Sequence, residues 1–203
     1  MDIGRGDNYD HLVSMSSREQ SLSEAAKKDK FWATEFACGD MNTTLIKTKK
    51  GKTIMLQFDT HTGRPYSRLN TVTGTKAVHE GYPSRLYVGH EELQWGHSWL
   101  KEDEYKDYRE KYDHPLCKRL REQIDANAVG HGGMAFGMVY RMIRCLNQGL
   151  SLDINLYDSV LWSAITPLSQ ISVANNSAST TVPDFTGGSW ENPRKNEVLR
   201  EIM

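Results

Sequence analysis

The sequence predicts an α+β fold, with a largely antiparallel open sheet and helices packed on one face. Two runs rich in β-forming residues, 43–48 and 52–60, flank Lys49-Lys50-Gly51, which is the pattern of a β-hairpin. In the second half of the chain, apolar residues recur three and four apart, as in amphipathic helices. Because strands come first and helices follow, with few strand–helix–strand alternations, we expect an antiparallel sheet.

The strands can be placed in order. Residues 9–15 alternate weakly and predict a strand, and residues 18–30 are polar and helix-compatible. After the hairpin, residues 66–73 predict a third strand. Two more short strands are expected at 77–79 and 84–88, on either side of a Gly-Tyr-Pro turn.

Four helices are expected in the second half. Residues 101–111 are highly charged, and Pro115 suits the first turn of a helix that reaches about residue 126. The next helix, 134–147, carries one apolar stripe, four members of which fall four apart: Met134, Met138, Met142 and Leu146. The last helix begins near Asn155 and is rich in small residues, which let a helix lie close on a sheet or on another helix.

Composition excludes several classes of protein. The 203 residues include 25 basic and 26 acidic side chains, a formal net charge of -1, which gives no basic footprint for nucleic acid. No run approaches the roughly 20 apolar residues of a membrane-spanning helix. The three cysteines form no Cys-x-x-Cys pair, so neither a zinc site nor a disulfide framework is expected, and Cys145 fits a buried apolar position.

The segment Gly63-Arg64-Pro65-Tyr66-Ser67-Arg68 holds the first candidate site. Guanidinium groups offer forked donors, and a phenol both donates and accepts, which suits sugar hydroxyls. Arg64, Tyr66 and Arg68 are therefore candidate substrate-binding residues. The alternative is that Arg68 pairs with a surface carboxylate.

The second candidate is His131-Gly132-Gly133, immediately before a predicted helix. Paired glycines let the backbone approach a ligand and leave N–H groups free at the positive helix end, where His131 could donate or carry a proton. The alternative is a tight turn in which the glycines satisfy packing and the histidine caps a carbonyl.

Weaker signals favour structural roles. Asp59 and His61 lie two apart in the sequence, but a polar loop explains both. Trp95 and Trp99 could stack on a sugar ring, but the preferred interpretation is that they attach their loop to the core. No Gly-x-Gly-x-x-Gly occurs, so the sequence predicts no complete dinucleotide site.

Five segments carry a resemblance to a known family. They are MDIGRGDNYDHLVSMSS, FDTHTGRPYSRLNTVTGTKA, HGGMAFGMVYRMIRCLNQGL, LYDSVLWSAITPLSQISVANNS and VPDFTGGSW. In this order they resemble the C-terminal half of glycoside hydrolase family 109, whose members are similar to the Gfo/Idh/MocA oxidoreductases. The resemblance covers most of the chain.

The resemblance implies an organisation and a chemistry. Residues 1–203 would form one C-terminal domain for substrate binding and oligomerisation, while the N-terminal Rossmann domain, which binds NAD, is absent from this chain. The implied reaction hydrolyses α-linked N-acetylgalactosamine by oxidation, elimination, addition of water and reduction. The implied catalytic Tyr and His belong to the missing part. Tyr66 would contact the sugar, Arg64 or Arg68 would shape the pocket, and His131 would face the cleft.

Two other functions stay open at this point. One is a sugar dehydrogenase of the same superfamily using NAD(P), and the other is a non-catalytic binding or assembly domain. The resemblance further implies a carbohydrate substrate and a homo-oligomer formed through the sheet face. No segment assigns a compartment, and the resemblance is compatible with a parent exported to the periplasm of a Gram-negative bacterium.

Overall fold

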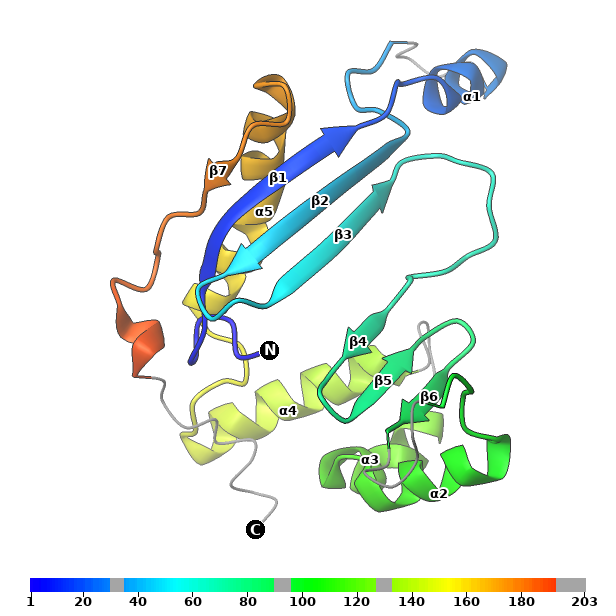
Figure 1. Cartoon of the computed structure of the whole chain (residues 1–203). Coiled ribbons are helices and arrows are strands. Elements are labelled where there is room, and N and C mark those ends of the chain that lie inside the picture. The colour runs from blue at the N-terminus through cyan, green and yellow to red at the C-terminus, as the bar shows by residue number, and fades with distance from the viewer. Residues whose placement is uncertain (30–34, 90–95, 127–132, 193–203) are drawn as a thin grey trace. The chain divides into compact units, whose positions relative to one another are not determined.

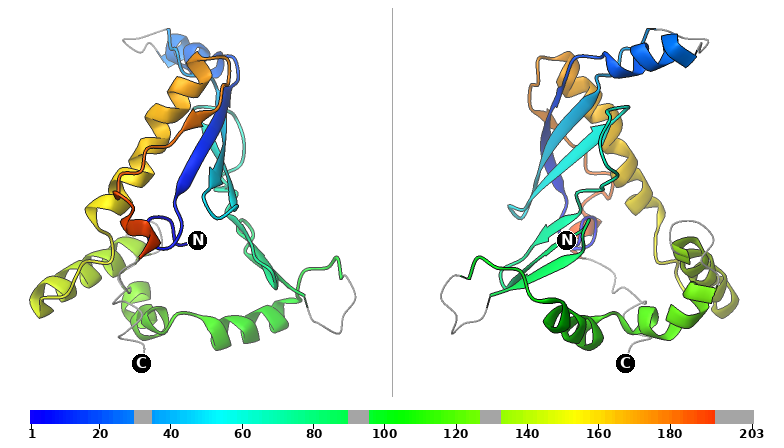
Figure 2. Two further views of the ribbon diagram at one scale, coloured as in Figure 1. Left: turned by 60° about the vertical axis from the view of Figure 1, so that its left-hand side comes forward. Right: turned by 90° about the vertical axis from the view of Figure 1, so that its right-hand side faces the viewer.

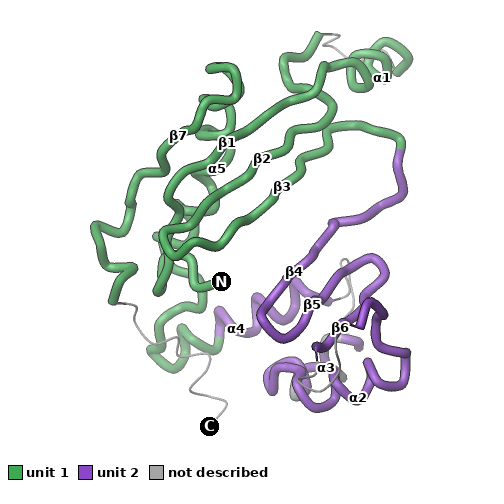
Figure 3. Tube along the Cα trace, in the orientation of Figure 1, with its two compact units in different colours: residues 1–63, 144–201, 203 green, residues 64–143, 202 purple. Residues whose placement is uncertain are grey.

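The computed structural model describes residues 1–29, 35–89, 96–126 and 133–192 (Figure 1). Its described residues divide into two compact units, the first made of residues 1–63 and 144–192 and the second of residues 64–143 (Figure 3). Helices and open antiparallel sheets occur together, so the α+β class is confirmed. The single domain expected over residues 1–203 stays a prediction.

The first unit contains a four-stranded antiparallel sheet of order β3-β2-β1-β7. Its elements are β1 (Tyr9–Ser16), α1 (Ser21–Asp29), β2 (Met41–Thr48), β3 (Thr53–Asp59), α5 (Leu156–Ala174), β7 (Thr180–Thr181) and the 3-10 helix η2 (Ser189–Glu191). The predicted hairpin is confirmed: β2 pairs with β3 across a turn in which Gly51 adopts φ +85°. Glycine is the residue that takes this conformation without a steric penalty.

Helix α5 lies along one face of this sheet (Figure 2). The core between them is apolar and fully enclosed at its centre, where Leu12, Ile46 and Leu161 are 0–1% exposed. Cross-strand pairing sets Leu12 of β1 beside Ile46 of β2 on the side that α5 covers. The expected covering of one sheet face by a helix is thus confirmed for this unit.

A line of buried hydroxyl groups continues the interface between β1 and α5. Ser172 Oγ accepts a hydrogen bond from Ser14 N at 2.9 Å and donates to Ala178 O at 2.7 Å. Thr44 Oγ1 lies 2.8 Å from Ser14 Oγ and 3.0 Å from Ser169 Oγ. Small side chains let the helix approach the strand closely, and the hydrogen bonds satisfy the polar groups that this approach buries.

A capping box and residues near the N-terminus of the chain hold the first turn of α5 in place. Asn155 Oδ1 accepts from Asp158 N at 3.0 Å, and Asp158 Oδ2 accepts from Asn155 N at 2.9 Å, which forms a capping box. Arg5 forms an ion pair with Asp158. Gly4, at φ +76°, passes so close to Leu161 that a Cβ would lie 2.8 Å from its Cδ1. The N-terminal turn therefore packs against α5.

The second unit contains a three-stranded antiparallel sheet of order β4-β5-β6. Its elements are β4 (Thr71–Thr73), β5 (Ala77–Glu80), β6 (Arg85–Val88), α2 (Glu102–Tyr112), α3 (Pro115–Ala126) and most of α4 (Met134–Gln148), the last turn of which belongs to the first unit. Pro115 is the first residue of α3, as expected. Gly149 follows α4 at φ +65°, the left-handed conformation common at helix ends.

One strand prediction is wrong in extent. The third strand was expected over residues 66–73, but β4 covers only Thr71–Thr73. Leu69 adopts φ +47°, which interrupts an extended run. The side chains of Tyr66 and Arg68 also hydrogen-bond to each other, so residues 66–70 form a local structure in place of sheet pairing.

Candidate functional site

The topology of the second unit brings two loops together at one end of its sheet. β4 begins at Thr71, β5 ends at Glu80, and these two residues pair with each other. Just beyond the pair, Gly81 N donates to Asn70 O at 2.7 Å. Because β4 and β5 are antiparallel, the segment before β4 lies beside the turn that follows β5. Tyr66 and Arg68 are thereby placed next to Tyr82.

Tyr66, Arg68 and Tyr82 form a contacting cluster, which we call the tyrosine–arginine cluster. Arg68 Nε donates to the Tyr66 phenol oxygen at 2.7 Å, and the guanidinium carbon lies 5.9 Å from the Tyr66 ring centroid. The rings of Tyr66 and Tyr82 meet edge to face, with centroids 5.6 Å apart and an interplanar angle of 87°. The hydrogen bond to Tyr66 raises the pKa of Arg68, so its guanidinium stays charged.

The cluster faces solvent, because the Tyr66 side chain is 70% exposed and that of Tyr82 is 45% exposed. The Tyr66 oxygen accepts from Arg68 and keeps its own hydrogen for an external acceptor. An aromatic ring and a phenol donor beside a permanent cation are groups that can bind hydroxyl and amide oxygens of a sugar.

A second polar network follows in the same turn. His79 Nε2 lies 3.0 Å from Ser84 Oγ, which lies 2.6 Å from the Tyr105 hydroxyl on α2. Arg85 pairs with Glu80 at 3.0 Å, and its guanidinium carbon lies 4.4 Å from the Trp99 ring centroid. These contacts tie α2 and residues 96–100 to the sheet, so they hold the turn that carries Tyr82.

The predicted site residues have different outcomes. Arg64, Tyr66 and Arg68 lie on one exposed loop, and Tyr66 and Arg68 are in direct contact. His131 lies outside the described residues, as does Trp95. The Trp99 ring contacts the Arg85 guanidinium and is 36% exposed, so the core position expected for Trp99 is wrong. Tyr82 was missed, although the Gly-Tyr-Pro turn between two predicted strands was the signal that could have found it.

Asp59 stabilises the polar loop that the sequence predicts at this position. Its Oδ1 accepts from Thr62 N at 2.9 Å, and its Oδ2 accepts from the Thr62 hydroxyl. Such an aspartate-centred turn is typical of a chain leaving a strand.

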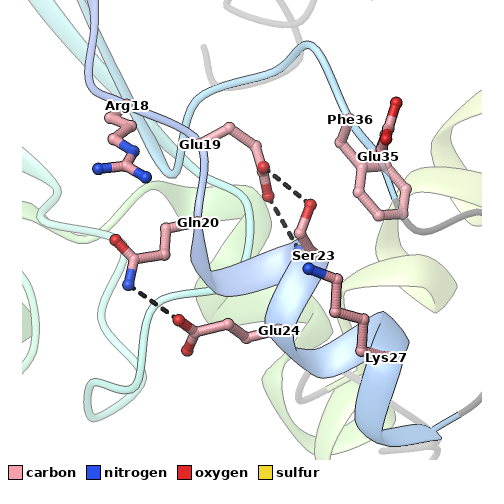
Figure 4. A pocket seen from close by; sticks show the side chains of 8 residues that line it. All are labelled: Arg18, Glu19, Gln20, Ser23, Glu24, Lys27, Glu35 and Phe36. Carbon is pink, nitrogen blue, oxygen red and sulfur yellow. Dashed lines mark hydrogen bonds between the residues drawn. The ribbon is translucent and has the colours of Figure 1, made fainter.

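A hollow of about 410 Å³ adjoins the start of α1 in the first unit (Figure 4). Glu19 Oε1 accepts from Ser23 N at 2.9 Å and Glu19 Oε2 from Ser23 Oγ at 2.8 Å, while Gln20 donates to Glu24 at 2.8 Å. The bonds from Ser23 to Glu19 satisfy donors of the first turn of α1, and the bond from Gln20 to Glu24 joins two side chains of the lining.

The described residues contain neither a three-ligand metal cluster nor the parallel strand–helix–strand unit of a Rossmann dinucleotide site. Within residues 1–29, 35–89, 96–126 and 133–192, no three His, Cys, Asp or Glu side chains gather as metal ligands. Both described sheets are antiparallel, whereas dinucleotide sites of the Gly-x-Gly-x-x-Gly type need a parallel strand–helix–strand unit. Among the same residues, no helix is long and apolar enough to cross a membrane.

The chain therefore has an α+β fold, and its tyrosine–arginine cluster exposes to solvent groups that can bind a sugar. Residues 1–192 match the model of the family described as Glycosyl hydrolase 109, C-terminal domain. The chain belongs to glycosyl hydrolase family 109.

Two relatives show how much of a family member this chain represents. A "Glycosyl hydrolase family 109 protein" of Shewanella sp. (strain W3-18-1) is 45% identical over 201 residues, which are 96% of this chain and 43% of that protein. The "Alpha-N-acetylgalactosaminidase" of Shewanella oneidensis is 44% identical over 201 residues, with the same two shares. The chain thus spans about 43% of the length of these relatives.

Proposed function

We propose that this chain is the substrate-side domain of a glycosidase that hydrolyses α-linked N-acetylgalactosamine. The observation that carries the proposal is the exposed phenol of Tyr66, held by Arg68 at 2.7 Å, in a chain 44% identical to a protein named for that activity. In the proposed complex the phenol donates to a sugar or N-acetyl oxygen, and the ring of Tyr66 or Tyr82 packs on the apolar face of the sugar.

For the whole protein we propose NAD as cofactor, as the family resemblance implies. Its binding residues would lie mainly in the part of the parent outside this chain, because the resemblance places the Rossmann domain there. No redox step is therefore assigned to residues of this chain. The proposed role of these residues is to bind and orient the sugar.

The isolated chain is expected to be inactive. With NAD⁺ and an aryl α-N-acetylgalactosaminide, release of the aryl group should stay at the rate of a protein-free control. The reason is that the resemblance places the catalytic groups in the part of the parent outside residues 1–203. A clear enzyme-dependent rate from this chain alone would contradict the assignment of catalysis to the missing part.

The role of Tyr66 is testable in a joined chain, in which the part of the Shewanella oneidensis relative that precedes the aligned 201 residues is followed by this chain. Tyr66→Phe removes one hydrogen-bond donor and should lower kcat/KM for the aryl glycoside about 10-fold. Tyr66→Ala also removes the ring and should lower it about 100-fold.

Tyr112 offers a matched control, because it is 66% exposed on α2 and Tyr66 is 70% exposed. Tyr112→Phe should leave kcat/KM unchanged. If Tyr66→Phe and Tyr112→Phe had equal kcat/KM values, Tyr66 would not bind the sugar.

The alternative function, a sugar dehydrogenase, has its own readout. Net accumulation of NADH with free sugars, without glycoside cleavage, would favour it.

We also propose that the parent forms a homo-oligomer through the sheet face that α5 leaves open. Cross-strand pairing places Met15, Leu45 and Met55 on that face, and they are 66%, 51% and 62% exposed. Apolar side chains that gather on an open sheet face favour association.

A further inference from the structure

Helix α4 exposes an apolar stripe along its length. Six residues at helical spacing are between 47% and 63% exposed: Met134, Met138, Val139, Met142, Ile143 and Leu146. From Met134 to Leu146 the stripe runs about 18 Å at the helical rise of 1.5 Å per residue. We call these six residues the α4 stripe.

The arrangement is unlike that of an ordinary surface helix. The buried residues of α4 are Arg141, 6% exposed, and Cys145, 1% exposed. An amphipathic helix normally turns its apolar side inward and its charged side to water. Here a guanidinium is enclosed while six large apolar side chains meet solvent, and a contiguous exposed stripe of this kind marks a contact surface.

We infer that the α4 stripe is the docking surface for the N-terminal part of the parent protein. The family model that matches residues 1–192 is that of a C-terminal domain, and the aligned segment makes up 43% of the relatives. More than half of such a protein therefore lies outside the aligned segment, and a domain described as C-terminal is preceded by another part of the chain. A segment in the same polypeptide meets the stripe at an effective concentration of order millimolar, well above that of a second molecule.

The chemistry of the stripe defines its partner. Three of the six side chains are methionines, which adapt to irregular apolar surfaces, and Val139, Ile143 and Leu146 add branched aliphatic groups. None of the six can form a strong hydrogen bond. The complementary surface is an apolar patch long enough to cover about three turns of helix.

The test compares Met138→Lys in this chain and in the joined chain. In this chain Met138 is 60% exposed, so the substitution should change Tm by no more than about 1 °C. In the joined chain the lysine would be buried against an apolar surface, and Tm should fall by about 5 °C or more. Leu156→Lys is the matched control: Leu156 is also an apolar residue on a helix, it is 73% exposed on α5, and its substitution should shift both proteins alike.

Three results would overturn the inference. Met138→Lys could shift both proteins equally, which would mean that the stripe stays in water. The joined chain could unfold in two transitions, one identical to that of this chain alone, which would mean that the two parts do not dock. Sedimentation could show that this chain is a dimer that Met138→Lys dissociates, which would make a second copy the occupant.

Discussion

Leu161→Ala is expected to lower the free energy of unfolding by about 3–4 kcal/mol. Leu161 is fully buried on α5, within the cluster that contains Leu12 and Ile46. Removing three carbon atoms of the side chain loses their transfer free energy and leaves a cavity. The backbone at Gly4 lies close to Leu161, so the cavity would open beside the N-terminal turn.

Leu156 provides the control, because it is 73% exposed on the same helix. Leu156→Ala makes the same chemical change with little loss of burial, and it should cost less than about 0.5 kcal/mol. Urea unfolding followed by circular dichroism would give both values. If the two variants lost similar stability, the contact between α5 and the sheet would not be the core of the first unit.

Much of the first unit could be predicted because its signals are local. The hairpin followed from two β-forming runs around Gly51, and the close approach of α5 followed from its small residues. The structure confirms the second point in detail: Ser169 and Ser172 are buried where α5 meets the hydroxyl groups of Ser14 and Thr44.

The errors and omissions arise where local pattern is insufficient. Residues 66–73 have strand-like composition, but the left-handed backbone of Leu69 and the side-chain bond between Arg68 and Tyr66 prevail over that preference. The spacing of the α4 stripe predicts one apolar face, and the structure has that face. Periodicity indicates that a helix face is apolar, but it does not indicate whether the surface that covers this face lies in the same chain.

The candidate site was predicted in part for the same reason. Tyr66 and Arg68 are two residues apart and could be grouped from sequence. Tyr82 joins them only because β4 and β5 pair with Thr71 opposite Glu80, a register that composition does not specify. The packing role of the N-terminal turn also has no signal in the sequence: Arg5 pairs with Asp158, and Asp7 is fully buried.

Asp7→Asn is expected to cost roughly 2–4 kcal/mol at pH 7, because a buried carboxylate surrounded by donors would become an amide. Asp7 Oδ1 accepts from the backbone N–H groups of Asn8 at 2.8 Å and Lys50 at 3.0 Å, and Oδ2 accepts from Lys52 Nζ at 3.1 Å. These bonds fasten the N-terminal turn to the hairpin between β2 and β3. An asparagine NH₂ group would face one or more of these donors.

The same contacts set the pH dependence. Burial raises the pKa of the Asp7 carboxyl, but hydrogen bonds from Lys50, Lys52, Thr48 and Asn8 together lower it below its ordinary value of 3.8. The folded state therefore favours the ionised form. This stabilisation is complete at pH values above the unfolded pKa and is lost as the pH falls below about 4, through the lower folded pKa.

Asp184 reinforces the acid sensitivity of the same region. Burial raises the pKa of its carboxyl, and hydrogen bonds from Thr186, Gly188 and Asn8 lower it by more. Asn8 Nδ2 donates to Asp184 Oδ1 at 3.0 Å, so adjacent residues of the N-terminal turn contact both the hairpin and the C-terminal turn. Protonation of either carboxylate should loosen this junction.

Unfolding in urea at pH 7, 5, 4 and 3 would test the argument. The wild-type chain should lose stability steeply between pH 4 and 3, while Asp7→Asn should be less stable at pH 7 and lose less on acidification. Asp107→Asn, on the exposed surface of α2, should follow the wild-type curve. If Asp7→Asn were as stable as the wild type at pH 7, the buried carboxylate would not hold the N-terminal turn to the hairpin. If it fell as steeply in acid, the sensitivity would reside in Asp184 and the other carboxylates whose pKa is lowered, Asp10 and Asp40.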